Sequence, residues 1–128
     1  MAVEGTKIKE LKLPDTVTQI GEEAFSFSSL EKIALSKSMK SIPVKAFSYS
    51  SLKQMYIPAS VTSIDREAFN AIYRMTDIYY GGSDWSNVEI NATGNDVLTD
   101  GTVTVHCNAS SSDLGLMETT SLLSLFGF

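Results

Sequence analysis

The sequence predicts a solenoid, in which short repeated coils stack with a parallel β-sheet along one face and turns or 3₁₀ segments along the other. Two observations carry this prediction. Ala-Phe pairs recur every 22 residues, at residues 24–25, 46–47 and 68–69. Four segments of the form LxxLxL, with large apolar residues in the L positions, begin at Ile8, Leu30, Leu52 and Met75. The repeated units therefore run over residues 8–29, 30–51 and 52–74, and a fourth strand starts at residue 75.

Each unit is expected to contribute one strand. Residues 10–13, 32–35, 54–57 and 77–80 alternate polar and apolar side chains, which is typical of a half-buried strand. Equivalent strands of successive coils lie parallel in a solenoid. Pro14 and Pro58 follow two of these strands and would stop the pairing. The short pieces 22–25, 45–47 and 66–69 then form turns or 3₁₀ segments, so the chain is mostly β and coil.

The repeat also predicts the core. The phenylalanine of each Ala-Phe pair should contact its equivalents one coil away, and an isoleucine lies five residues before each of them. A structural column explains large buried aromatic residues better than a functional role does. The predicted structural core contains Phe25, Phe47, Phe69, Ile20, Ile42 and Ile64.

Two stretches of the chain carry a family resemblance. LPDTVTQIGEEAF at residues 13–25 is repeated as IPASVTSIDREAF at residues 57–69. These strings resemble the BspA-like leucine-rich repeat family, and the match covers about residues 8–80. The resemblance implies a leucine-rich repeat solenoid from a secreted or cell-surface bacterial protein engaged in adhesion and protein–protein contact. The middle unit departs from the family pattern at Ser36, Met39 and Pro43, which should alter local packing but not the fold.

Composition divides the chain into three parts. Residues 1–80 form the leucine-rich repeat array. Residues 81–108 are expected to be a C-terminal β cap, because polar turn residues surround the apolar Trp85, Val88 and Ile90 and a strand is predicted at 102–106. Residues 109–128 are Ser-rich and then apolar. An amphipathic helix packed on the cap, a cloning-derived extension and a disordered tail remain open for this last part.

Several classes of protein are disfavoured by composition. A net charge of −5 disfavours nucleic-acid binding by phosphate neutralisation. A single cysteine excludes an intrachain disulfide, and a single histidine excludes a histidine-rich metal cage. No stretch approaches the roughly 18 apolar residues that cross a membrane. The first residues also lack the apolar centre of a signal peptide.

The search for catalytic motifs predicts no enzyme, and neither a cofactor nor a metal ion is expected. GxGxxG, Walker, HExxH and GxSxG patterns do not occur. Residues 96–101 faintly resemble a calcium loop, but Leu98 and Cys107 stand where ligands are required, which favours a solvated turn. His106 and Cys107 are neighbours on a predicted strand, so their side chains should point to opposite faces.

The outward positions of the predicted strands are the candidate binding surface. The third positions hold Glu10, Lys32, Gln54 and Asp77, and the fifth positions hold Lys12, Ala34, Tyr56 and Tyr79. Because parallel strands lie about 4.8 Å apart, the two tyrosines should be neighbours in an exposed aromatic step. Tyrosine is favoured at interfaces. Plain stacking that stabilises the sheet is the alternative. The candidate surface comprises Tyr56, Tyr79, Gln54, Asp77, Lys32, Glu10 and Lys12.

The main functional hypothesis is a non-catalytic protein-binding or adhesion module that binds a protein or host-surface ligand. Because Ile8 already occupies the first repeat column, we expect the module to be a fragment of a longer chain. Self-association through the exposed solenoid ends or the apolar C-terminal tail is also expected. The alternative is a structural spacer that displays a neighbouring domain. Residues 75–128 carry seven acidic and no basic residues, which suggests an acidic cap.

Overall fold

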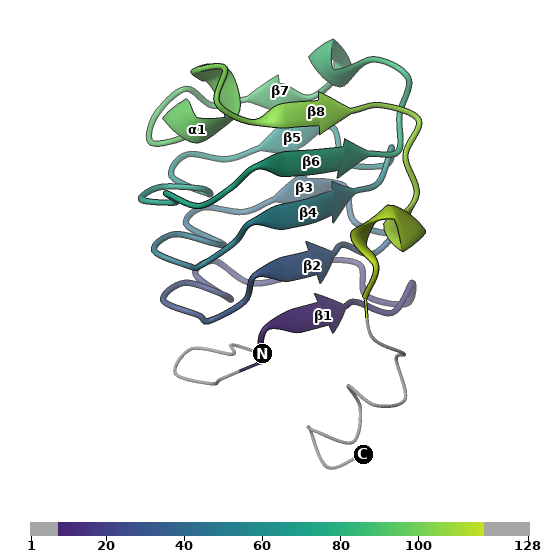
Figure 1. Cartoon of the computed structure of the whole chain (residues 1–128), viewed down its shortest axis with the longest axis horizontal. Helices are drawn as coiled ribbons and strands as arrows, with labels where there is room; N and C mark the ends of the chain where they lie inside the picture. Colours follow the sequence, from purple (N-terminus) through teal and green to yellow (C-terminus); the bar gives the residue numbers. More distant parts are fainter. Residues whose placement is uncertain (1–7, 117–128) are drawn as a thin grey trace.

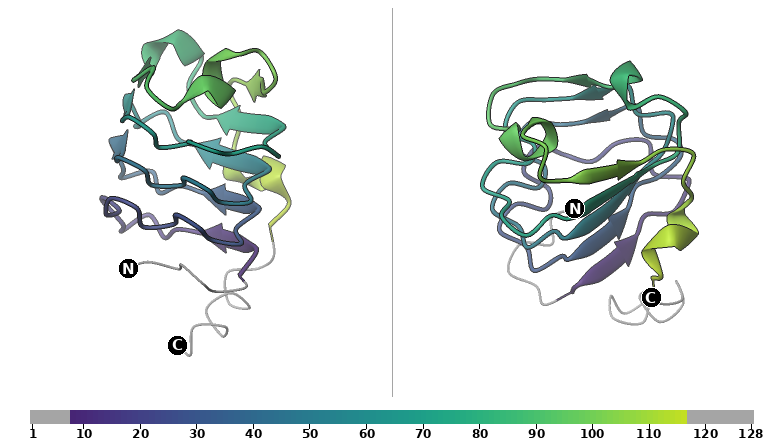
Figure 2. Two further views of the ribbon diagram at one scale, coloured as in Figure 1. Left: turned by 90° about the vertical axis from the view of Figure 1, so that its left-hand side faces the viewer. Right: turned by 45° about the horizontal axis from the view of Figure 1, so that its top comes forward.

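A computed structural model describes residues 8–116 and shows a parallel β-solenoid of about four coils (Figures 1 and 2). Residues 1–7 and 117–128 lie outside the described residues, and the predicted self-association through the apolar C-terminal tail falls on the second of these ranges. One sheet runs the length of the stack in the order β1-β2-β4-β6-β8, with all pairs parallel. Its strands are β1 (Glu10–Lys12), β2 (Lys32–Ala34), β4 (Gln54–Ile57), β6 (Asp77–Tyr80) and β8 (Thr104–His106). The predicted fold class is confirmed.

The register of this sheet follows the repeat. Glu10 pairs with Lys32, Lys32 pairs with Gln54, and Gln54 pairs with Asp77. The residues that follow them, from Leu11 to Ile78 across the four strands, turn inward and are buried. This is the pairing expected from the columns, because a slip of one residue would move the whole apolar set to the solvent side. β8 extends the sheet by one further strand beyond β6.

A second, smaller sheet lies on the return path of the coils. It contains β3 (Ser41–Ile42), β5 (Ser63–Ile64) and β7 (Glu89–Ile90), paired in parallel in that order. Two-residue strands are too short to produce a periodic signal, so sequence reasoning treated these segments only as connections. Ile42 and Ile64 are fully buried, whereas Ile20, one coil earlier, is only partly buried.

The segments around the Ala-Phe pairs are turns hydrogen-bonded from coil to coil. In each of the first three coils, two residues other than glycine adopt left-handed φ angles of 57–59°: Glu23 and Phe27, Lys45 and Tyr49, Glu67 and Ala71. In this conformation Phe27 N–H donates to Ser48 O at 3.0 Å and Tyr49 N–H donates to Asn70 O at 2.9 Å. A left-handed residue costs about 1–2 kcal/mol. The hydrogen bonds between coils offset that cost.

The three phenylalanines of the repeat form a buried column inside the stack. The ring centroids of Phe25 and Phe47 are 5.4 Å apart, and those of Phe47 and Phe69 are 5.6 Å apart. Both pairs are stacked, with interplanar angles of 4° and 17°. The spacing follows from the separation of adjacent strands, because equivalent residues recur once per coil.

The last coil is closed by a side chain that sequence reasoning did not identify. Phe25 N–H donates to Ala46 O, and Phe47 N–H donates to Ala68 O in the next coil. Above the third coil, the side chain of the fully buried Asn95 takes the place of such a carbonyl and accepts from Phe69 N–H at 3.0 Å. Its amide group donates to two backbone carbonyls, at 2.9 and 2.7 Å. The helix α1 (Asp96–Thr99) and the 3₁₀ helix η1 (Trp85–Asn87) complete this end.

Candidate functional site

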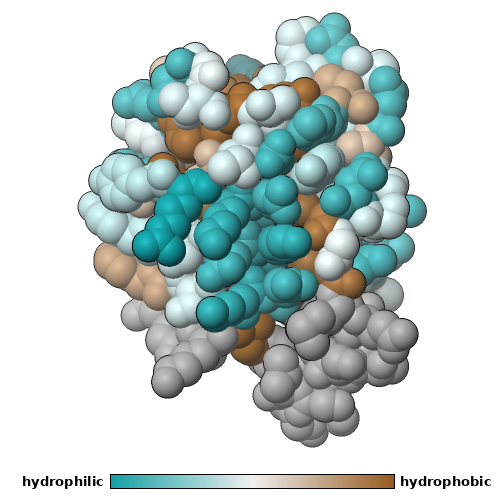
Figure 3. Space-filling view, viewed as in Figure 1, coloured by the Kyte–Doolittle hydropathy of each residue, from teal (hydrophilic) through white to brown (hydrophobic). Residues whose placement is uncertain are grey.

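The outer face of the larger sheet carries the residues predicted to bind a partner. Figure 3 shows a row of hydrophilic side chains down the middle of this face. The third-position side chains Glu10, Lys32, Gln54 and Asp77 are all partly buried, whereas Lys12 is exposed. The charges along the row are mixed, so the face has no single sign that would select one kind of partner.

Tyr56 is not the exposed residue that the sequence predicted. Its partner across the sheet is Tyr79, as expected, but only 6% of Tyr56 is exposed. The ring lies outside the solenoid core in a small cluster with Ala34 and Leu114. Burial raises the pKa of Tyr56 above its ordinary value of 10.0. The expected aromatic step is therefore covered by Leu114, which comes 58 residues after Tyr56 in the sequence.

The covering segment, residues 110–116, is here called the strap. It contains the 3₁₀ helix η2 (Ser111–Leu114) and passes over the sheet from β6 toward β2 (Figure 1). Ser110 and Asp113 form a capping box, with Ser110 N–H donating to Asp113 Oδ2 at 2.9 Å. Lys32 Nζ donates to the carbonyl of Leu114 at 2.9 Å. Part of the predicted binding surface is thereby occupied by the chain itself.

Beside the strap, on the same face, the carboxylate of Asp77 is hydrogen-bonded to three neighbouring side chains. His106 Nε2 lies 2.9 Å from Asp77 Oδ1, while Thr76 Oγ donates to Asp77 Oδ2 at 2.7 Å and Gln54 Nε2 donates to the same oxygen at 3.2 Å. The ring of Tyr79 stacks on His106 with centroids 4.7 Å apart. The hydrogen bonds from His106 and then Thr76 lower the pKa of Asp77. These contacts organise the sheet surface, and every member belongs to a neighbouring strand or its flank.

Metal ligands do not gather on the described part of the chain. Within residues 8–116, no group of three or more His, Cys, Asp or Glu side chains could hold an ion. Residues 96–99 of the faint calcium pattern form α1, and Asp100 caps the turn that follows by accepting from Thr102 N–H and Oγ–H.

The loops before the strands present a second surface, one that sequence reasoning missed. Phe27, Tyr49 and Tyr73 are the large apolar or aromatic side chains most exposed in the described chain, at 61%, 53% and 89%. Phe27 and Tyr49 stack with centroids 4.8 Å apart and an interplanar angle of 1°. We call this stacked pair the edge aromatics. A signal was present, because FSF and FSY recur 22 residues apart, but the third copy reads FNA and hides the column.

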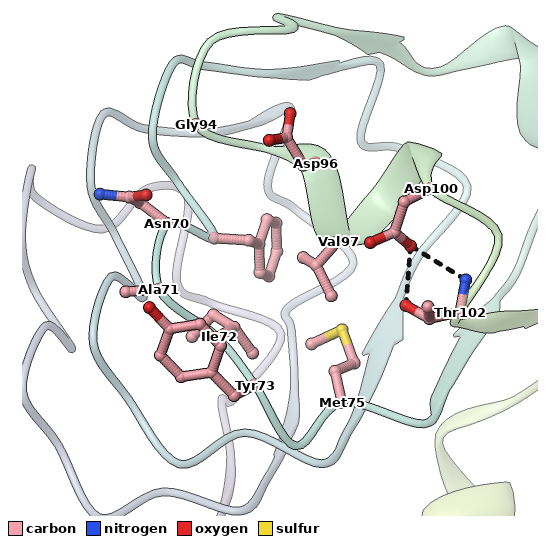
Figure 4. A pocket seen from close by; sticks show the side chains of 11 residues that line it. Asn70, Ala71, Ile72, Tyr73, Met75, Gly94, Asp96, Val97, Asp100 and Thr102 are labelled. Atoms are coloured by element: carbon pink, nitrogen blue, oxygen red, sulfur yellow. Dashed lines mark hydrogen bonds between the residues drawn. The ribbon is translucent and has the colours of Figure 1, made fainter.

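A pocket of about 480 Å³ lies at the same loop edge, between the third coil and α1 (Figure 4). We call it the end pocket. Apolar side chains form its inner part, and Tyr73, Asp96, Asp100 and Thr102 stand around it. The hydrogen bonds from Thr102 to its carboxylate lower the pKa of Asp100. The complete lining comprises Phe69, Asn70, Ala71, Ile72, Tyr73, Met75, Gly94, Asp96, Val97, Asp100 and Thr102.

Comparison with known proteins agrees with this architecture. A family model described as a BspA type leucine rich repeat region matches residues 2–99 in six copies. No curated protein and no solved structure matches the chain. Among residues 8–116, no helix has both the length and the apolar character needed to cross a membrane.

Proposed function

Since the chain belongs to the BspA-type leucine-rich repeat family, we propose that it is a non-catalytic protein-binding and adhesion module of a secreted or cell-surface bacterial protein. Leucine-rich repeats of this kind suggest protein-interaction modules, and their solenoid is typically a binding scaffold without catalytic activity. Proteins of the family are usually found at the surface or secreted. The proposed partner is a protein or host-surface ligand.

The observation that carries the proposal is the pair of edge aromatics. Phe27 and Tyr49 expose more than half of their surface, although apolar rings of this size are ordinarily buried. Hydrogen bonds between coils fix the backbone at both residues. A partner would therefore bind stacked rings carried on a backbone that is already ordered, which lowers the entropic cost of association. Aromatic residues are also enriched among those that dominate binding energy.

The sheet face supports a smaller contact. Lys12 is exposed, and Asp77 and Tyr79 are partly exposed beside the strap. We propose these three residues as a secondary contact area, while Tyr56 and Lys32 serve to hold the strap.

The proposal is tested by measuring the binding of the full chain to an array of host-surface proteins and glycans. The double variant Phe27→Ser/Tyr49→Ser should bind a detected partner at least about tenfold more weakly, because two aromatic anchors are removed. Lys37→Ser, on an exposed residue outside both proposed contact areas, is the surface control and should change affinity by less than about twofold. Equal affinity of the double variant and the wild type would contradict a role for the edge aromatics.

A structural spacer is the second candidate. It is favoured by the mixed charges of the sheet face and by the strap that covers part of it. A spacer needs rigidity but no ligand of its own. Failure of the wild-type chain to bind any protein or glycan on the array would favour this function over adhesion.

A further inference from the structure

The end pocket lies where the third coil differs in sequence and length from the other two. Ala71 has the same left-handed backbone as Phe27 and Tyr49, and its coil lies directly on that of Tyr49, whose N–H donates to Asn70 O. The third coil therefore repeats the backbone conformation of the edge aromatics, but it carries the methyl group of Ala71 in place of an aromatic ring. The third unit also contains one extra residue between its phenylalanine and the next strand, and here Tyr73 turns outward. The result is an opening lined by Ala71 and bordered by an exposed ring.

The inner part of the pocket is apolar. Phe69, Ile72 and Met75 belong to the buried core, and Val97 of α1 packs against it. Figure 4 shows Met75 and Val97 side by side between Ile72 and Asp100. Such a surface favours the methylene groups of a ligand rather than a small hydrated ion.

The α1 side of the pocket is acidic. Asp96 and Asp100 are both exposed and line the pocket, whereas none of its described lining residues is basic. Thr102 holds one oxygen of Asp100 through bonds of 2.9 and 2.7 Å and so fixes the direction of that carboxylate. Tyr73 lies on the opposite side (Figure 4). An aromatic face attracts a cation that lies above it.

We infer that the end pocket binds the side chain of an arginine or lysine from a protein partner. Long cationic side chains combine an apolar stem with a charged end, and the pocket combines an apolar inner part with two carboxylates and an exposed ring. Arginine is favoured because its planar guanidinium pairs with carboxylates and stacks on aromatic rings at once. The excess of acidic residues after residue 75 would attract a basic segment from a distance. This inference rests on the proposed function only in taking the partner to be a protein.

The direct test is titration of the ¹⁵N-labelled full chain with the capped peptide acetyl-Gly-Arg-Gly-amide, followed by NMR. Saturable shifts are expected at the amides of residues 71–73 and 96–102, with affinity that falls as salt is raised. The same peptide with citrulline, which keeps the shape of arginine without its charge, is the ligand control and should cause no saturable shift. Equal shifts with both peptides would overturn the inference.

Matched variants separate the pocket from the general negative charge of the cap. Asp96→Asn/Asp100→Asn should weaken binding of the arginine peptide about tenfold, because two charge contacts are lost. Asp84→Asn/Glu89→Gln removes the same charge from exposed positions outside the pocket, and Asp84 holds Ser86 as Asp100 holds Thr102. This control should change affinity by less than about twofold. Equal weakening by the two double variants would reduce the effect to long-range charge and overturn the site.

Tyr73 provides an independent readout. Tyr73→Ala should weaken binding of the arginine peptide about threefold, whereas Tyr73→Phe should retain it, because the ring face and not the hydroxyl contacts the cation. Equal affinities of wild type and Tyr73→Ala would remove the ring from the site. If the pocket binds the arginine peptide but the chain binds no protein on the array, the proposed function fails and this inference stands. Array binding that depends on the edge aromatics, together with an inert pocket, would defeat this inference alone.

Discussion

Asn95 shows how one side chain ends a stack of repeated coils. Every coil leaves backbone N–H and C=O groups that the next coil would pair, and buried groups of this kind are costly when unpaired. The side-chain amide of Asn95 has both an acceptor and donors, so it satisfies one N–H and two carbonyls at once. A leucine or an alanine at this position could fill space but could not replace these hydrogen bonds.

We therefore predict that Asn95→Ala lowers the free energy of unfolding by about 3 kcal/mol, because the buried Phe69 N–H and two partly buried carbonyls lose their partner. Urea denaturation measures the change. Asn87→Ala, on an exposed residue of η1, is the matched control and should change stability by less than about 0.5 kcal/mol. Similar effects of the two substitutions would show that Asn95 does not close the stack.

Asp77 makes the stability dependent on pH. Its pKa is lower in the folded chain, first because of the hydrogen bond from His106. Folding therefore favours the ionised carboxylate, and its contribution is present at neutral pH and lost as the pH falls through the folded pKa. The wild type should lose thermal stability as the pH falls below about 4, whereas Asp77→Asn should lose less over the same range.

Melting temperatures measured from pH 7 to pH 3 test this expectation. Glu22→Gln, which changes an exposed carboxylate on a turn, should keep the wild-type slope. The same slope for Asp77→Asn would mean that other groups dominate acid unfolding.

Among the elements, the strap decides which part of the sheet a partner could reach. Leu114 is buried against Ala34 and Tyr56, although it belongs to a turn of only four residues. The turn holds its shape through the capping box and through Gly115, whose φ of 64° is left-handed. An apolar anchor on a pre-formed turn can therefore cover a tyrosine without a long helix.

Leu114→Ala should lower the free energy of unfolding by about 2 kcal/mol and expose Tyr56. Because burial raises the pKa of Tyr56, the variant should return that pKa toward 10.0. Spectrophotometric titration of the tyrosines at high pH measures the shift. Ser112→Ala, on the exposed side of the same turn, is the control, and a Tyr56 pKa unchanged by Leu114→Ala would mean that the strap does not bury the ring.

At the scale of the whole molecule, stability comes from neighbouring coils. The larger sheet joins every coil to the next, the smaller sheet joins the coils that carry β3, β5 and β7, and the phenylalanine column joins the first three coils. When the interfaces between neighbouring repeats are strong, a substitution that destabilises one repeat should also destabilise the others. Phe47 is the middle ring of the column and has a stacked neighbour on each side.

Phe47→Ala should lower the free energy of unfolding by about 4 kcal/mol, and more than Phe25→Ala, which removes an end ring. Trp85, the single tryptophan, lies in the cap and reports on the far end of the stack. Its fluorescence and the far-UV circular dichroism should shift together in the variant, as expected for one cooperative unit. Two separate transitions would show that the coils unfold independently.

The 22-residue repeat by itself determined the solenoid, the strands of the larger sheet and their register, because periodic apolar residues can be buried in only one pairing. It also determined which rings meet in the column. The second sheet was not predicted, because strands of two residues leave no periodic pattern in the sequence. The edge aromatics were not predicted, because the third repeat has Ala71 where the first two have an aromatic ring.

Tertiary structure alone decided the exposure of Tyr56, the closing role of Asn95 and the position of the end pocket. The outward direction of Tyr56 follows from the strand, but its burial depends on Leu114, which reaches it from beyond β8. Asn95 and the pocket residues of α1 lie beyond the three units in which the Ala-Phe pairs recur. A repeat fixes contacts between equivalent positions, whereas contacts between the array and the non-repeating segment depend on how the chain folds back, and no periodicity encodes that path.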